Sequence, residues 1–192
     1  MPNWCQNTLN VSGNEKDIEK FKNAARGYHA GYKETLHRKE WPAHDDVRVK
    51  AYVKDPAPLG ETRHDLCMNA LFPVPLDYRR FPFDCGQARK MGEIVGEKRE
   101  NGGYSWQSQN WGCKWDVQGE LLQSEGTFLQ YQFDSPWSPP IPFFEKIAPE
   151  FPNLIFELEY YEPGMAYAGR TTFQGDHYDE IDLPIEDFED FE

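Results

Sequence analysis

The sequence predicts an α+β fold in which a mostly antiparallel sheet is covered by helices on one face. Apolar and polar residues alternate over 128–133 and again over 154–161, which is the period of a half-buried strand. The chain between these runs carries apolar residues at helical spacing. A similar strand–helix pair begins the chain, so we expect a two-layer sandwich whose second sheet face meets solvent.

The first strand is expected within residues 3–12, because its apolar residues alternate before a Ser-Gly-Asn stop. Asn14, with the acidic Asp17 three residues later, predicts the N-cap of a helix. Apolar residues at helical spacing extend this helix to residue 26.

Residues 27–65 break the pattern, and we interpret them as an inserted lobe. Basic and acidic residues balance there, four of the five histidines fall within it, and three prolines interrupt regular structure. Alternating valines at 47–53 suggest a short strand. A loop of this length is either functional or disordered. After the insertion we expect a strand over 66–72 and a helix with Ala88, Met91 and Val95 on one side.

Between the two alternating runs, a helix is expected to begin at a Ser138 cap, with prolines in its first turn. Pro149 should bend its last turn. Its buried stripe is expected to be Phe144, Ile147, Ala148 and Phe151. Further strands are expected over 165–173 and 177–183. We therefore predict one domain over residues 1–183 and an exposed acidic tail over 184–192.

Charge narrows the classes of partner. The net charge is −13, and residues 176–192 hold nine acidic residues and no Lys or Arg. This balance argues against direct nucleic-acid binding, which needs clustered cations. No apolar run approaches the roughly 20 residues of a membrane span. The start of the chain has no signal-peptide core, so we expect a cytoplasmic protein.

No catalytic or metal-binding pattern stands out. The four cysteines lie far apart and are expected to be reduced, partly buried thiols. The histidines have no zinc-ligand spacing, so we expect no metal and no cofactor. A Cys–His pair could be drawn from Cys5, Cys67 or Cys113 with His64 or His177. No spacing selects one of these pairs, and we assign no catalytic residue.

The candidate binding residues are Trp111, Lys114, Trp115, Asp116 and Trp137. An exposed aromatic pair beside a Lys–Asp couple would suit a partner anchor or a stacked base. The other interpretation is a tight turn at Gly112 whose tryptophans enter the core. Lys114 and Asp116 would then pair with each other or with the backbone. Trp137 has the same two interpretations.

Several unusual short sequence motifs occur in order along the chain. They are Met1-Pro2-Asn3-Trp4-Cys5 with Asn7, Asn69-Ala70-Leu71 with Pro73 and Pro75, Asn110 to Asp116, Trp137-Ser138-Pro139-Pro140, and Glu162-Pro163-Gly164-Met165. In these motifs the chain resembles the YubB/Api-type ferredoxin-like domain family of phage and plasmid proteins. The resemblance covers the chain outside the insertion and the tail. It implies a split β-α-β sandwich and a mobile-element origin, and it implies no reaction.

The sequence thus favours a non-enzymatic protein that binds a host or phage macromolecule, most of all a protein. Its acidic tail either mimics the phosphates of DNA or serves only as a solvated tail. The alternative is an enzyme or small-ligand-binding domain, with its pocket between the 27–65 insertion and the Trp111–Asp116 turn. A third hypothesis, single-strand nucleic-acid binding on the open sheet face, is disfavoured by the negative charge.

Overall fold

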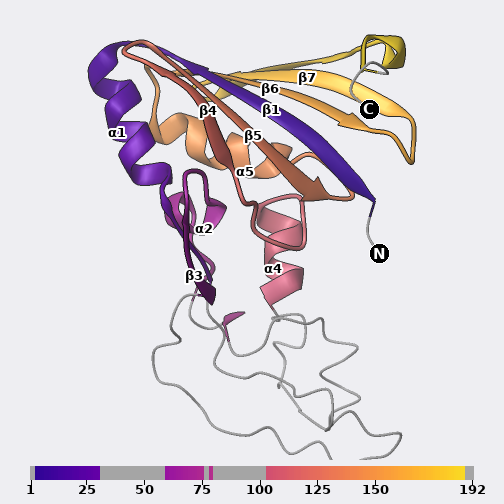
Figure 1. Cartoon of the computed structure of the whole chain (residues 1–192), viewed down its shortest axis with the longest axis horizontal. Coiled ribbons are helices and arrows are strands. Elements are labelled where there is room, and N and C mark those ends of the chain that lie inside the picture. The colour runs from indigo at the N-terminus through magenta and orange to yellow at the C-terminus, as the bar shows by residue number, and fades with distance from the viewer. Residues whose placement is uncertain (1–2, 31–58, 76–77, 80–102, 189–192) are drawn as a thin grey trace, which may run out of the picture.

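A computed structural model describes residues 3–30, 59–75, 78–79 and 103–188. One six-stranded antiparallel sheet organises them, in the order β4-β5-β1-β6-β7-β8. Its strands are β1 Trp4–Ser12, β4 Glu120–Glu125, β5 Phe128–Pro136, β6 Ile155–Glu162, β7 Tyr167–Gln174 and β8 His177–Asp182. In Figure 1 the described helices α1, α2, α4 and α5 all lie below the sheet, which leaves its upper face open.

The described helices are α1 Glu15–Ala25, α2 Met68–Leu71, α4 Gly103–Asn110 and α5 Ile141–Ile147, with 3-10 turns η3 Ala148–Glu150 and η4 Ile185–Phe188. A separate two-stranded sheet pairs β2 Gly27–His29 with β3 Leu59–His64. No helix among the described residues is long and apolar enough to cross a membrane.

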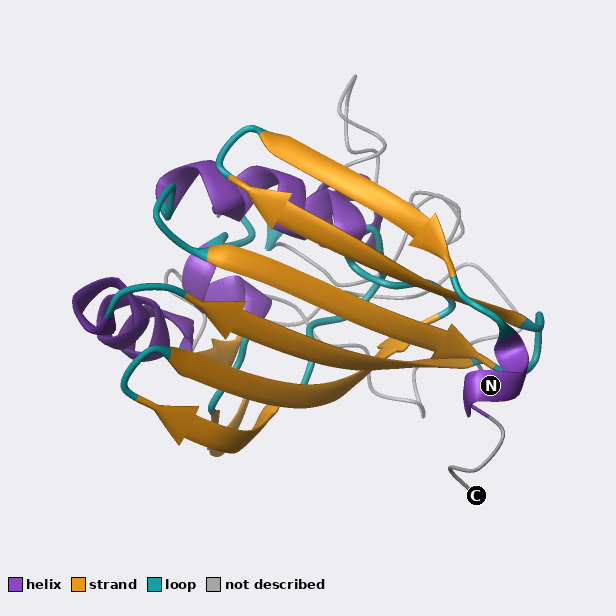
Figure 2. Ribbon diagram, turned by 90° about the horizontal axis from the view of Figure 1, so that it is seen from above, coloured by secondary structure: helices purple, strands orange, loops and turns teal. Residues whose placement is uncertain are grey.

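Two interleaved β-α-β units make the main sheet ferredoxin-like. The unit β1-α1-β4 leaves room for β5 between its strands, and the unit β5-α5-β6 leaves room for β1. This is the split β-α-β arrangement that the family resemblance implies, and it confirms the predicted α+β sandwich. The hairpin β7–β8 then widens the sheet beyond β6, as Figure 2 shows from above.

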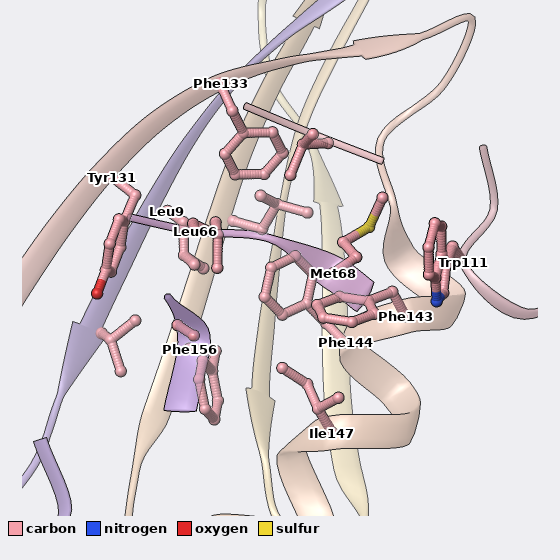
Figure 3. Packing of buried hydrophobic residues seen from close by; sticks show 14 of the residues in the cluster. Leu9, Leu66, Met68, Trp111, Tyr131, Phe133, Phe143, Phe144, Ile147 and Phe156 are labelled. Atoms are coloured by element: carbon pink, nitrogen blue, oxygen red, sulfur yellow. The ribbon is translucent and has the colours of Figure 1, made fainter. Parts of the chain in front are cut away.

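Strand alternation builds the core on the helix-covered face. Leu9 on β1 pairs across the sheet with Tyr131 on β5 and Leu158 on β6, and all three side chains are buried. Phe21 of α1 packs edge-on against Phe156, with ring centres 5.2 Å apart. Figure 3 shows this aliphatic and aromatic layer reaching from β5 to α5. Each fully buried side chain of this size contributes roughly 1.5–3 kcal/mol, which fixes the register of the sheet.

Several predicted elements are confirmed. The first strand, both alternating runs and the two late strands lie where the sequence predicts them. Asn14 caps α1, because its side-chain oxygen accepts the Asp17 backbone N–H at 3.0 Å. The predicted stripe on α5 is buried, and the chain at Pro149 tightens into η3.

Other predictions are wrong. Residues 66–72 do not form a strand, since only Leu66 makes a bridge and α2 follows. Ser138 does not cap α5. The helix begins two residues after Pro139, and the Ser138 hydroxyl donates to the Gly112 carbonyl at 2.9 Å. The sequence interpretation also missed α4 and β4. The predicted strand at 47–53, the helix around Met91, and the end of the tail lie outside the described residues.

Candidate functional site

Trp111 belongs to the core. Its side chain exposes 0% of its surface, and its indole N–H donates to the Phe72 carbonyl at 3.0 Å. The ring packs edge-on against Trp106, with centres 5.7 Å apart. Figure 3 places it at the α5 end of the hydrophobic layer, near Phe143. A ring packed in this way offers no surface to a partner, so Trp111 acts from inside the fold.

Asp116 also faces inward, and its carboxylate holds the start of α2 through hydrogen bonds. One carboxylate oxygen accepts the backbone N–H of Met68 at 2.7 Å and that of Val117 at 2.9 Å. The other oxygen accepts the Asn69 N–H and the Cys67 thiol, each at 3.1 Å. Burial raises the pKa of Asp116 above its usual range, while His29 and these hydrogen bonds oppose the rise. Both oxygens are therefore occupied by groups that hold the chain.

Two histidines bring the ends of the inserted segment to this turn. The rings of His29 and His64 stack with centres 4.7 Å apart, and His29 Nε2 lies 3.2 Å from the Val117 carbonyl oxygen. Burial lowers the pKa of His64, and the neighbouring His29 lowers it further, whereas Asp116 acts in the opposite direction. The described ends of the inserted segment, at His29 and His64, therefore lie beside the Trp111–Asp116 turn.

The described thiols are poor nucleophiles. Burial raises the pKa of Cys5 to about 12, and it raises the pKa values of Cys67 and Cys113 as well. A protonated, buried thiol lacks the reactivity that a catalytic cysteine needs. His177, the other histidine considered, lies exposed on β8. Among the described residues, no group of three or more His, Cys, Asp or Glu side chains is placed to hold a metal ion.

Three other tryptophans of the described residues gather at one end of β1. We call Trp4, Trp115 and Trp137 the tryptophan patch. The rings of Trp4 and Trp115 lie 6.1 Å apart, and Trp115 also meets Tyr104 edge-on. The Trp137 N–H donates to the Asn3 carbonyl at 2.9 Å, which places Trp137 beside the start of β1. Trp4 and Trp137 are 47% and 48% exposed, so this end of the sheet presents large apolar rings to solvent.

Trp137 has an unusual backbone. Its φ is +74°, in the left-handed region that a bulky side chain rarely occupies. The conformation is fixed from both sides, because Asn3 accepts from its N–H and the Tyr167 hydroxyl donates to its carbonyl at 3.0 Å. Strain of this kind persists only where the surrounding structure imposes it, and it gathers at binding sites.

Lys114 is exposed on the segment between Trp111 and Trp115. Of the five predicted binding residues, the structure thus brings Trp115 and Trp137 to one region of surface, with Lys114 on the same short segment as Trp115. It turns Trp111 and Asp116 inward. Trp4, which the sequence interpretation left unassigned, is exposed like Trp137, whereas Trp115 is half-buried beside it.

The open sheet face is polar and acidic. Arg170 is the one Lys or Arg in the six strands of the main sheet, and its Nε donates to Glu159 at 2.8 Å. Tyr161 on this face is stacked by Phe188 of η4, with ring centres 5.4 Å apart. The other side chains that the register places here include Gln6, Asn10, Gln130, Gln132, Glu120, Asp134, Glu157 and Asp179. The face therefore offers a phosphate backbone little attraction.

Comparison with known proteins gives a match to one family model and a similar fold. Residues 110–192 match the family model described as the ferredoxin-like domain in Api92-like protein. The whole structure is similar to that of protein api92 from Yersinia pseudotuberculosis, with a TM-score of 0.53 and 12% sequence identity, over 95% of this chain and 98% of that chain. The curated proteins gave no match. The resemblance to the Api-type ferredoxin-like family is thereby confirmed: residues 110–192 match its ferredoxin-like domain model, and the fold of the chain is that of the solved structure.

Proposed function

We propose that this protein acts by binding a macromolecule of a bacterial host or phage, namely a protein, through the tryptophan patch. One observation carries the proposal. Trp137 presents about half of its surface to solvent from a left-handed backbone that glycine would adopt at lower cost. A large exposed ring kept at such a position, next to two further tryptophans, suits an interface anchor, because tryptophan is the residue type most enriched at binding hot spots.

A protein partner fits the surroundings of the patch better than a nucleic acid does. The adjoining sheet face carries acidic and amide side chains, and Arg170 there is paired with Glu159. Protein interfaces combine an apolar centre with a polar rim. Here the exposed tryptophan rings would form the centre, and the amide and acidic side chains of the sheet face would form the rim. A single strand of nucleic acid would need cations along its path in addition to the rings.

The arrangement also favours binding over catalysis. An acid–base catalyst needs a carboxylate or imidazole free to exchange a proton with a substrate. Both oxygens of Asp116 accept hydrogen bonds from the protein itself, and the three described thiols are held protonated by burial. Asp116 and Cys67, at the Trp111–Asp116 turn, are thus engaged in holding α2.

Capture from a bacterial lysate tests the proposal. The tagged chain and its Trp4→Ala/Trp137→Gly variant are compared by quantitative mass spectrometry of bound proteins. Glycine is chosen at 137 because it accepts the left-handed backbone. We expect at least one protein retained by the wild type to fall about tenfold or more with the variant, as loss of a hot spot predicts.

A matched control removes exposed apolar surface elsewhere. Leu122 on β4 is 51% exposed and lies outside the patch, so Leu122→Ala should leave the bound set unchanged. Circular dichroism confirms that each variant is folded. An identical bound set for the wild type and the patch variant would refute the proposal.

A further inference from the structure

A groove of about 580 Å³ lies between the first turn of α5 and the β7–β8 hairpin. It exists because β8 extends the sheet to one side of α5. The prolines Pro139 and Pro142 form one wall, and Glu180 and Asp182 on β8 form the other. Tyr160 and Tyr167 line it between these walls. Ser138, which follows Trp137, also lines it, and the Tyr167 hydroxyl donates to the Trp137 carbonyl, so one end of the groove lies beside the backbone of Trp137.

The shape of the groove depends on packing that a larger side chain at one position would prevent. Tyr160 lies across β7 over Gly169, where an added Cβ would come within 2.4 Å of the tyrosine oxygen. This lets the Tyr160 hydroxyl donate to Glu180 at 2.6 Å, which orients that carboxylate. The rings of Tyr160 and Tyr167 meet edge-on with centres 6.2 Å apart. The aromatic surface and the oriented carboxylate are therefore parts of one packed unit.

The chemistry of the lining selects the occupant. Two carboxylates and the partly exposed ring of Tyr167 line the groove, the buried Tyr160 holds Glu180 from behind, and none of the described residues that line it is Lys or Arg. A guanidinium satisfies this combination, since its flat face stacks on aromatic rings while its edge donates to carboxylates. An ammonium group would meet the charge but would stack less well.

We propose that this groove accepts an arginine side chain of the protein partner, inserted between the α5 prolines and β8, with its guanidinium donating to Glu180 and Asp182. The inference deepens the proposed function, because it names the chemistry by which a protein partner is recognised beside the tryptophan patch. The acidic edge strand then serves to recognise this partner as well as to keep the protein soluble.

A peptide-binding assay tests the groove separately from the tryptophan patch. The probe is a fluorescein-labelled Gly-Arg-Gly-Arg-Gly amide, and binding is followed by anisotropy at low salt. The Glu180→Gln/Asp182→Asn variant removes two charges while the glutamine oxygen can still accept from Tyr160. We expect it to weaken binding about tenfold or more, and the matching Gly-Lys-Gly-Lys-Gly probe to bind the wild type several-fold more weakly.

The control removes the same charge outside the groove. Glu186→Gln/Asp187→Asn lies on the exposed η4 turn and should change binding less than about twofold, as expected for long-range electrostatics. Equal weakening in both double variants would overturn the proposal, as would no saturable binding by the wild type, equal binding of the lysine probe, or tighter binding of spermine. Trp137→Gly should leave peptide binding intact, so failure of the groove and failure of the patch are separate results.

Discussion

Two short tryptophan-containing turns of this chain have different structural roles. The turn from Trp111 to Asp116 points Trp111 and Asp116 inward, where they bind Phe72 and α2. The turn at Trp137 points its ring outward and carries a left-handed backbone. Both depend on a neighbouring strand or helix for their hydrogen bonds, yet one fastens the fold and the other presents a surface.

The difference shows that residue type alone does not identify a binding residue. At Trp111 the indole N–H has a buried acceptor, so the ring can be fully desolvated without leaving a polar group unpaired. At Trp137 the main chain makes the hydrogen bonds, and about half of the side chain's surface remains in water. Substitutions should therefore affect stability at the first turn and recognition at the second.

The largest effect is expected for Trp111→Ala. Removing a fully buried tryptophan leaves a cavity and an unpaired Phe72 carbonyl, so the free energy of unfolding should fall by about 4 kcal/mol. Urea denaturation followed by circular dichroism measures it. Trp137→Ala serves as the comparison, and a loss there as large as at Trp111 would erase the proposed contrast.

The next effect concerns Asp116→Ala. The backbone N–H groups of Met68, Asn69 and Val117 would lose their acceptor, which should cost about 2–3 kcal/mol. The same denaturation experiment applies. Asp116→Asn keeps one oxygen and should cost less, so an asparagine variant no more stable than the alanine variant would contradict the fastening role.

A smaller effect separates two variants of the second turn. Glycine normally destabilises a protein relative to alanine, but at the φ of +74° of residue 137 it avoids strain. Trp137→Gly should therefore be more stable than Trp137→Ala by about 1 kcal/mol. Thermal and urea unfolding of the two variants decide this, and the usual order, with alanine more stable, would show that the backbone at 137 is unstrained.

The smallest expected effect is a change in the pKa of His64, which lies beside the Trp111–Asp116 turn. His29 lowers the pKa of His64, so His29→Gln should raise it toward the ordinary value of 6.5. A lowered pKa in the folded state means that the unfolded chain takes up the proton more readily. The stability from His64 is then full above pH 6.5 and is lost as the pH falls through the lowered folded value.

NMR titration of His64 in the wild type and the variant measures the shift directly. His177→Gln is the matched control, since His177 is exposed on β8 and should not affect His64. An unchanged His64 pKa in His29→Gln would mean that the two stacked imidazole rings have no electrostatic interaction.

Much of the fold could be predicted because the strands carry a strong two-residue period. Leu129, Tyr131 and Phe133 alternate with polar residues, and each is buried as that period requires. The same period holds the signal for the missed Trp4. If Leu9 and Val11 face inward, even-numbered residues of β1 face the open side, and Trp4 is exposed by that rule.

The sequence pattern could not predict α2, because long-range contacts decide it. Residues 66–72 are apolar enough for a strand, but Asp116, about 50 residues later, binds the N–H groups that begin a helix. The Ser138 prediction failed for a similar reason, since its hydroxyl has a nearer partner in the Gly112 carbonyl. The strained backbone at Trp137 likewise depends on Asn3 and Tyr167, which no local pattern connects to it.

The pairing of β2 with β3 has a consequence for how the chain can vary. Gly27 lies opposite His64, so the polypeptide leaves the sandwich and returns to it at neighbouring points. The cost of closing such a loop grows only slowly with its length. The number of residues that join β2 to β3 can therefore change with little effect on the stability of the six-stranded sheet.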